Sequence, residues 1–341
     1  MKKRRNLLYI GNKLSKKGNT ISTIEHLAGK LQEEGFVVKT ASSVQSKPLR
    51  MVDMLYCVYK NRMWADLVLI DTYSTLNFQY AVQIASLCRF LNLPYIPILH
   101  GGNLPSRLQK SKRQSRKLFG NAKTNVAPSL YLYEAFKKEG FKNLTHIPNT
   151  IKIENYPFLL RNNIQPKLLW VRSFSEIYNP MLAIQVLENL IHTGYKKAEL
   201  CMVGPEKDGS LARCKKYVDQ KKLPVTFTGS VAKTEWIQKS QAYDVFINTT
   251  NVDNTPVSVI EAMALGLPVV STNVGGMPYL ISHKKTGYLV PPNSKEKLTE
   301  AIKYLLHNLN ETTTVTMKAR SAVEQFDWEK VKKLWNNTLQ G

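Results

Sequence analysis

The chain has 341 residues, of which 43% are hydrophobic and 21% charged, and its formal net charge is +23. This composition excludes a disordered chain, and no run reaches the ~18 apolar residues of a membrane-spanning helix. Residues 1–150 hold 24 basic and 8 acidic residues, a balance of +16, against 24 and 17, a balance of +7, in residues 151–341. The basic first half favours an anionic partner, either nucleic acid or a phospholipid surface.

The N-terminal sequence MKKRRNLLYIGNKLS begins like a secretory signal, but its apolar stretch, residues 7–10, is too short for a signal-peptide core. We therefore expect a first buried strand and a cytoplasmic protein. The four cysteines, at positions 57, 88, 201 and 214, lack metal-ligand spacing. We expect them to be free thiols, and we expect no bound metal.

Short apolar runs alternate with amphipathic segments, such as residues 21–35 and 180–194, along the whole chain. Such alternation predicts parallel sheets that are covered by helices on both faces. The expected strands are residues 6–10, 36–40, 67–71, 95–99 and 124–127 in the first half, and 167–171, 198–203, 225–229, 244–248 and 268–272 in the second.

The two groups of strands predict an α/β protein with two Rossmann-like, doubly wound domains. Between them, residues 147–167 are rich in Asn and Pro and have no sustained periodicity, which is typical of a linker. The last segment has helical spacing, with Trp328, Val331 and Leu334 on one face. The expected division is a first domain at 1–150, a linker at 151–166, a second domain at 167–325 and a terminal helix at 326–341.

Residues 251–276, NVDNTPVSVIEAMALGLPVVSTNVGG, contain two acids and no basic residue in a strongly basic chain. After the strand at 244–248, Thr255 is the expected N-cap of a helix and Pro256 its first residue. A helix N-terminus at the carboxyl end of a strand attracts phosphate through its free N–H groups. Those of Asn254, Thr255 and Val257 are the candidates.

The two acids, Asp253 and Glu261, would border this anion seat on either side, because helical side chains tilt toward the N-terminus. Carboxylates accept hydrogen bonds from paired hydroxyls. Ribose at one acid, a second sugar at the other and a diphosphate between them would describe a nucleotide sugar. The alternative is that Asp253 caps the helix and Glu261 is a solvated surface residue.

The same stretch resembles the signature of retaining glycosyltransferases of family 4, which have the GT-B fold of two Rossmann-like domains facing across a cleft. Asp253, seven residues and Glu261 match a Glu-x7-Glu motif that is followed by Ala-Met-Ala-x-Gly-x-Pro-Val-Val. HIPNTIKIENYPF and MVGPE resemble the family's interdomain segment and one of its glycine turns. FDWEKV resembles its closing helix, which implies that the terminal helix packs back on the first domain. The resemblance covers nearly all of residues 5–338.

The resemblance implies that Glu261 holds the ribose hydroxyls of the nucleotide and Asp253 the hydroxyls of the transferred sugar. It also implies donor contacts for Gly204, in MVGPE, and for Gly18, in the first glycine-containing loop. The chain departs from the family in having Asp rather than Glu first, and NTPV after it. The identity of the donor sugar therefore stays open.

Arg172 follows a predicted strand directly, where a guanidinium suits a diphosphate. In the family an Arg here stabilises the departing nucleotide diphosphate, normally with a Lys five or six residues later. This chain has Tyr178 and Asn179 instead, and Asn179 is also a candidate cap for a helix that begins at Pro180. The second phosphate cation is therefore missing or comes from elsewhere.

His100 ends another predicted strand and precedes two glycines. The family often has a His at this strand end, near the sugar and the acceptor, so His100 is a candidate catalytic residue. The alternative is a structural histidine beneath a loop.

Residues 107–119 contain six basic side chains and no acid, with a thin apolar stripe at helical spacing. The stripe comprises Leu104, Leu108, Ser115, Leu118 and Phe119. This segment is either a solvated helix face or a contact with an anionic leaflet. Given the charge of its domain, we expect membrane contact, on the inner face of the cell membrane.

The leading hypothesis is a retaining hexosyltransferase that needs no metal or other cofactor. It would move a hexose from a nucleotide diphosphate sugar to a saccharide or lipid-linked acceptor bound by the first domain, in bacterial cell-surface polysaccharide synthesis. The alternatives are a catalytically inactive relative and a protein that binds nucleic acid or an anionic surface. No helix-turn-helix, zinc-finger or RNP-type motif supports nucleic acid as a partner. The donor base, acceptor, linkage and oligomeric state stay open.

Overall fold

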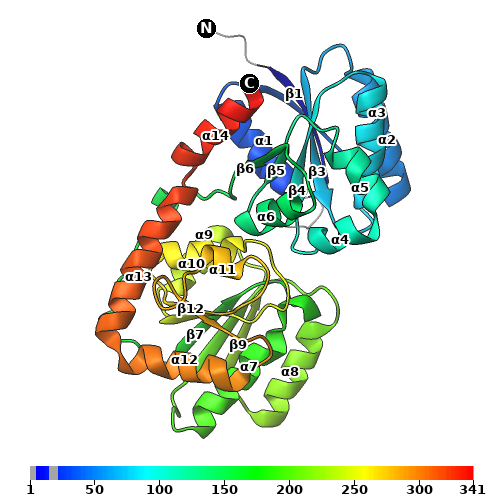
Figure 1. Ribbon diagram of the computed structural model, residues 1–341. Coiled ribbons are helices and arrows are strands. Elements are labelled where there is room, and N and C mark those ends of the chain that lie inside the picture. Colours follow the sequence, from blue (N-terminus) through cyan, green and yellow to red (C-terminus); the bar gives the residue numbers. More distant parts are fainter. Residues whose placement is uncertain (1–4, 15–21, 341) are drawn as a thin grey trace. The chain divides into compact units, whose positions relative to one another are not determined.

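The computed structural model describes residues 5–14 and 22–340 and divides into two compact units (Figure 1). The first unit extends to Pro148 and resumes at Val331, whereas the second comprises Asn149–Lys330. Each unit contains a six-stranded sheet. All neighbouring strands in both sheets are parallel, so each sheet must be covered on both faces.

The sheet of the first unit has the strand order β2-β1-β3-β4-β5-β6. Its strands are β1 (Asn6–Ile10), β2 (Val37–Ala41), β3 (Leu67–Tyr73), β4 (Tyr95–His100), β5 (Asn125–Ala127) and β6 (Leu144–His146). Its helices are α1 (Thr23–Glu33), α2 (Lys47–Lys60), α3 (Phe78–Phe90), α4 (Leu104–Lys110), α5 (Lys112–Phe119) and α6 (Leu130–Lys138).

Side chains alternate between the two faces of this sheet, as they must in a strand. Leu8 and Ile10 join a core with Phe78 and Phe119, which come from α3 and α5. Helices α2 and α5 both pack on α3, so these three helices form one layer (Figure 1). Helix α1 contacts β1 and β2 and starts at a capping box, in which the backbone N–H of Ser22 donates to the Glu25 carboxylate at 3.2 Å.

The sheet of the second unit has the strand order β12-β11-β10-β7-β8-β9. Its strands are β7 (Lys167–Val171), β8 (Glu199–Val203), β9 (Val225–Gly229), β10 (Val245–Asn248), β11 (Val269–Thr272) and β12 (Tyr288–Val290). Its helices are α7 (Pro180–His192), α8 (Ser210–Lys221), α9 (Lys233–Ser240), α10 (Val257–Ala264), α11 (Met277–Leu280), α12 (Lys295–His307) and α13 (Leu309–Val323). Short 3-10 helices lie at Ile153–Asn155, Glu176–Tyr178 and Glu324–Phe326.

The second sheet separates two hydrophobic cores. Leu168 and Trp170 of β7 belong to one core, which includes residues of α7 and α12. Leu169, which lies between them in the sequence, belongs to the other core, with residues of α10. The strands therefore read as continuous apolar runs, because both faces of each strand are buried.

The structure confirms the predicted fold class of two Rossmann-like α/β domains. All ten predicted strands are present, with boundaries within two residues of those expected. Strands β6 and β12 were not predicted. Each has only three residues, which is too short for an apolar run to stand out from the sequence.

Two expectations about helix faces were wrong. In α14 (Trp328–Gln340), Trp328, Val331, Trp335 and Leu339 are buried, whereas Leu334 is exposed, because the buried face follows steps of three and four residues. The segment expected as one helix at 107–119 is two helices that meet at Ser111. Its apolar residues are buried: Leu104, Leu108, Ser115, Leu118 and Phe119.

Candidate functional site

The carboxyl ends of β7 and β10 bring two predicted site residues together in the second unit. Arg172, directly after β7, forms an ion pair with Asp253, which lies in the loop between β10 and α10. The Asp253 carboxylate also accepts the N–H of Asn254 at 2.8 Å. The guanidinium carbon of Arg172 lies 4.2 Å from the ring centroid of Tyr178, within range of a cation–π interaction.

Two glycines allow close packing of the main chain beside this ion pair. Gly204 has φ +148°, and a Cβ there would overlap the carbonyl oxygen of Arg172. The N–H of Gly204 donates to the Gly229 carbonyl at 2.9 Å, so a backbone acceptor already uses this N–H group. Gly276 donates to the carbonyl of Asp253 at 3.0 Å, and a Cβ at Gly276 would overlap the carbonyl oxygen of Asn254.

Glu261, the second predicted acid, is buried within α10. Tyr156 donates its hydroxyl to Glu261 Oε1 at 2.6 Å, and the Nζ of Lys233, at the start of α9, pairs with the same carboxylate. Burial and then the Glu261 charge raise the pKa of Tyr156, so its hydroxyl stays protonated. The alternative interpretation of Glu261 as a solvated surface residue does not fit this environment.

Helix α10 begins one residue later than predicted, because Pro256 is its N-cap and Val257 its first residue. Within the part of the chain that the structure describes, no acceptor bonds the backbone N–H of Thr255 or Val257. These two groups are therefore available to an anion, whereas the N–H of Asn254 is bonded to Asp253.

Asn179 is a helix cap, as one of the two interpretations held. Its side chain accepts the N–H of Leu182 at 3.3 Å at the start of α7, where Pro180 is the first helical residue. The position of the usual second phosphate cation is thus taken by the cap and by Tyr178, which lies against Arg172. The structure shows a lysine elsewhere, Lys233, on the Glu261 carboxylate.

The loop that follows Arg172 is fixed to the loop after β8. Asp208 accepts the Ser175 hydroxyl at 2.7 Å and the N–H of Glu176 at 2.9 Å. A hydrogen bond from Ser210 and then these contacts lower the pKa of Asp208 to about 2. The two loops therefore stay joined throughout the neutral pH range.

His100 ends β4 in the first unit, where it contacts an acid that the sequence analysis missed. Its Nε2 lies 2.8 Å from Oδ1 of Asp71, a buried residue of β3, and its ring stacks on Tyr73 with centroids 4.9 Å apart. Tyr9 donates its hydroxyl to the same Oδ1 at 2.8 Å. If Nε2 carries the proton that faces Asp71, Nδ1 is left as a hydrogen-bond acceptor.

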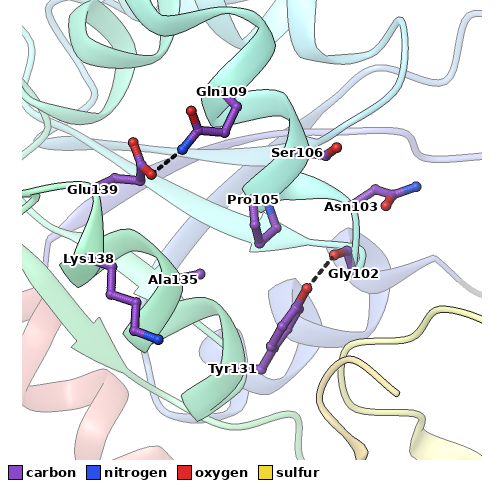
Figure 2. Close-up of a pocket in the computed structure, with 9 residues that line it drawn as sticks. All are labelled: Gly102, Asn103, Pro105, Ser106, Gln109, Tyr131, Ala135, Lys138 and Glu139. Atoms are coloured by element: carbon purple, nitrogen blue, oxygen red, sulfur yellow. Dashed lines mark hydrogen bonds between the residues drawn. The ribbon is translucent and has the colours of Figure 1, made fainter.

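A pocket of about 470 Å³ lies beside the loop that follows His100 (Figure 2). It is formed by the start of α4 and by α6, and Tyr131 donates its hydroxyl to the Gly102 carbonyl across it at 3.3 Å. Amide, hydroxyl and charged groups predominate among its lining residues, which are Gly102, Asn103, Pro105, Ser106, Gln109, Tyr131, Ala135, Lys138 and Glu139.

The predicted donor-site residues in the described part of the chain lie at or next to the carboxyl edge of the second sheet: Arg172, Gly204, Asp253, Asn254, Thr255, Val257 and Glu261. His100, predicted as a catalytic residue, lies in the first unit. Gly18 lies outside the described residues. Sequence reasoning missed Tyr156, Lys233, Gly276 and Asp71. The glycine pair after β11 offered a signal for Gly276, and the acid within an apolar strand offered one for Asp71.

Within residues 5–14 and 22–340, no three His, Cys, Asp or Glu side chains are grouped as a metal site requires. The four cysteines are free thiols. None of the helices in this same part of the chain is long and apolar enough to cross a bilayer.

The family model for glycosyl transferases group 1 matches residues 152–322, which contain the whole arrangement around Arg172, Asp253 and Glu261. The chain belongs to this family of glycosyltransferases. The resemblance noted in the sequence is thereby confirmed at the level of the family.

Two curated relatives match over shorter stretches. Sulfoquinovosyl transferase SQD2 of Arabidopsis thaliana is 33% identical over 109 residues, which is 31% of this chain and 21% of the relative. Amylovoran biosynthesis glycosyltransferase AmsK of Erwinia amylovora is 36% identical over 74 residues, which is 22% of this chain and 18% of the relative. The chain thus spans about a fifth of the length of these relatives.

The chain is similar in structure to HepE from Anabaena, solved in complex with UDP and glucose, over nearly its full length. Its TM-score is 0.76 and its sequence identity 17%, and the match covers 98% of this chain and 99% of HepE. The predicted GT-B fold is confirmed by this likeness and by the two parallel sheets.

Gly276→Ala should displace the loop that carries Asp253, because the added Cβ overlaps the Asn254 carbonyl. We expect sugar transfer to fall by about 10²-fold, as a displacement of one ångström at a reacting group can do. Steady-state kinetics would measure the loss. The control is Gly29→Ala in α1, where a Cβ meets no atom within 4 Å. Equal activity in the two variants would contradict the role given to Gly276.

Asp71→Asn should lower kcat for transfer and leave the affinity for nucleotide unchanged, because Asp71 orients His100 and lies outside the second unit. The matched control is Tyr9→Phe, which removes the other partner of the same carboxylate oxygen but retains the contact with His100. Kinetics and nucleotide calorimetry on both variants provide the comparison. If the two variants lose kcat equally, the effect comes from the stability of the strand and not from His100.

Proposed function

We propose that the chain is a retaining, metal-independent hexosyltransferase that uses a nucleoside diphosphate sugar. The observation that carries the proposal is the arrangement around the start of α10. An arginine paired with one acid, Arg172 with Asp253, lies on one side, and a second buried acid, Glu261, lies within the helix. A diphosphate requires the cation, and the hydroxyls of two sugars require the acids.

Charge on the leaving diphosphate would be met by the protein alone. The Nε of Arg172 is a buried donor without a hydrogen-bond partner among the described residues. A buried donor of this kind calls for an acceptor, which a phosphate oxygen supplies. The N–H groups of Thr255 and Val257 add to the positive end of α10. We assign no protein base, and the departing phosphate would take the proton of the acceptor.

The donor class is supported by the UDP and glucose bound in HepE, whose fold this chain shares. The proposed roles are that Glu261 binds the ribose hydroxyls and Asp253 the hydroxyls of the transferred hexose. Asp253 is one methylene shorter than Glu, so it accepts a sugar whose hydroxyls approach the ion pair more closely. Gly204 would contribute through the main-chain position of Arg172.

The acceptor is proposed to be a saccharide or a lipid-linked saccharide bound by the first unit. Hydroxyl-rich ligands suit the polar pocket beside the loop that follows His100, which is lined by the hydroxyl of Ser106 and by Gln109 and Glu139, whose side chains bond each other (Figure 2). His100 would accept a hydroxyl of the sugar or acceptor at Nδ1. The proposed biological role is cell-surface polysaccharide synthesis. It is supported by the similarity to AmsK, which is named as an amylovoran biosynthesis glycosyltransferase.

The roles of the two acids can be separated by calorimetry with UDP, GDP and ADP. Glu261→Ala should lower the affinity for the preferred nucleotide by about 10- to 100-fold, the range expected for loss of hydrogen bonds to a charged group. Asp253→Ala should bind free nucleotide diphosphate as wild type does but transfer sugar poorly. The control is Glu235→Ala, which removes an exposed acid of α9 that pairs with Lys239.

Equal loss of nucleotide affinity in both variants would contradict these roles. Failure of wild type to bind any of the three nucleotides would favour an inactive relative. For an active preparation, NMR of the newly formed anomeric proton tests retention, and an inverted product would overturn the proposed mechanism. Activity that disappears with chelator and returns with a divalent cation would overturn the metal independence.

Lys233 is the proposed second phosphate cation, because it is the lysine on the Glu261 carboxylate, and a bound nucleotide can draw it onto the diphosphate. Lys233→Met should lower the affinity for UDP by about two- to fivefold, as for loss of an exposed ion pair, and leave the affinity for uridine unchanged. The control is Lys239→Met on the same helix. A change of the same size for UDP and uridine would show that Lys233 does not contact the phosphates.

A further inference from the structure

Helix α2 carries a row of exposed apolar side chains. Leu49, Val52, Tyr56 and Tyr59 of α2, and Met63 in the turn that follows, are each between 51% and 91% exposed. Their spacing of three and four residues places the helical members on one face. A contiguous apolar face of this kind is uncommon on a folded surface and marks an interaction site.

A mainly apolar hollow adjoins this row. Its volume is about 440 Å³, and its walls include Met51, Val52 and Leu55 of α2, Leu76 from the segment after β3, and Tyr80 of α3. Val52 belongs to both the row and the hollow, so the two form one continuous surface. We call this row and hollow together the α2 face.

Basic groups lie at both ends of the α2 face. Lys47 begins α2 and also lines the hollow, and at the other end Lys60 Nζ lies 5.9 Å from the ring centroid of Tyr56. Helix α5 packs on α3, as α2 does (Figure 1). The exposed basic residues that it adds are Lys112, Arg113, Arg116 and Lys117.

We infer that the α2 face docks the protein on an anionic lipid bilayer, with the apolar row in the interface and the basic groups among the headgroups. An anionic bilayer provides both the apolar interior and the negative charge that this surface requires. A second copy of the chain would instead bring two basic surfaces together, which opposes association. Helices α4 and α5 contribute charge only, because their apolar residues lie in the core.

The hollow is positioned to bring a lipid chain near His100. Its lining includes Lys47, at the start of α2, and Leu76, which follows β3, and β3 ends at the same carboxyl edge of the sheet as His100. Tyr80, one of its walls, donates its hydroxyl to the carbonyl of Asp71 at 2.8 Å, and Asp71 holds His100. Delivery of a lipid-linked acceptor rests on the proposed function, whereas the docking surface itself does not.

The test is flotation of the full chain with vesicles of phosphatidylcholine alone and of phosphatidylcholine with phosphatidylglycerol. We expect wild type to float with the anionic vesicles. Val52→Glu with Tyr56→Glu should weaken this partition at least about tenfold, since charged groups are disfavoured at the apolar level of the interface. The control, Val37→Glu with Met317→Glu, makes the same change in net charge at two exposed apolar positions elsewhere.

Equal binding by the two double variants would overturn the inference, and so would failure of wild type to float. Sedimentation velocity addresses a second copy, because a wild-type dimer that Val52→Glu with Tyr56→Glu dissociates would make the α2 face a self-association surface. Circular dichroism and thermal unfolding check that both variants are folded. Vesicle binding without transferase activity would refute the proposed function and leave the docking surface standing.

Depth of insertion supplies an independent measurement. Lipids with brominated acyl chains should quench the emission that Tyr56→Trp adds to that of the five native tryptophans, but not the emission that Met317→Trp, on α13, adds. Quenching at position 56 supports insertion of the α2 face. Vesicle binding with equal quenching at both positions would mean that electrostatic adsorption alone holds the protein, which overturns the proposal.

Discussion

The ion pair between Arg172 and Asp253 is the constraint on which the binding edge of the second unit depends. The two side chains come from loops after different strands and can meet only if both main chains approach closely. Gly204 makes room for the carbonyl of Arg172, and Gly276 makes room for that of Asn254. The start of α10, with Thr255 and Val257, follows Asp253 closely in the chain. Charge, glycine placement and helix position form one arrangement, which is why a single short stretch of sequence carries so much of the family signature.

The local part of this arrangement could be predicted from the sequence, and the long-range part could not. Strands buried on both faces appear as apolar runs, and Asn179 with Pro180 marks a helix start by local chemistry alone. Tyr156 was missed because it lies 105 residues from its partner Glu261, in a segment that looked like a linker. Asp71 was missed because its importance comes from His100, on a neighbouring strand. Sequence periodicity predicts which face of an element a residue occupies. It does not predict which distant residue it contacts, because that depends on the fold.

The two units use charge in different ways. In the second unit, the cations Arg172 and Lys233 are each paired with an acid at the binding edge. In the first unit, basic groups of α5 lie on the outer surface without acids among them, and the apolar residues of that helix are buried in the core. A basic segment with an apolar stripe can therefore expose only its charged residues, because the apolar stripe is used by the core. The exposed apolar face lies instead on α2. The charged residues of that helix gave no signal in the sequence.

A site that carries its own counter-ions also selects among the anions of the cell. Inorganic phosphate or sulfate could reach the Nε of Arg172, which has no partner among the described residues, but it could take over the paired guanidinium nitrogen only by displacing Asp253, and the carboxylate would then lie largely buried without a cation. A sugar nucleotide brings negative charge for the arginine and hydroxyl donors for the carboxylate in the same molecule. Glu261 and Lys233 form a second such ion pair, at the end of the site where we propose that ribose binds. The built-in ion pairs thus make the binding of a simple anion at the paired nitrogens costly, because such an anion supplies the negative charge but not the hydroxyl donors that the freed carboxylate needs.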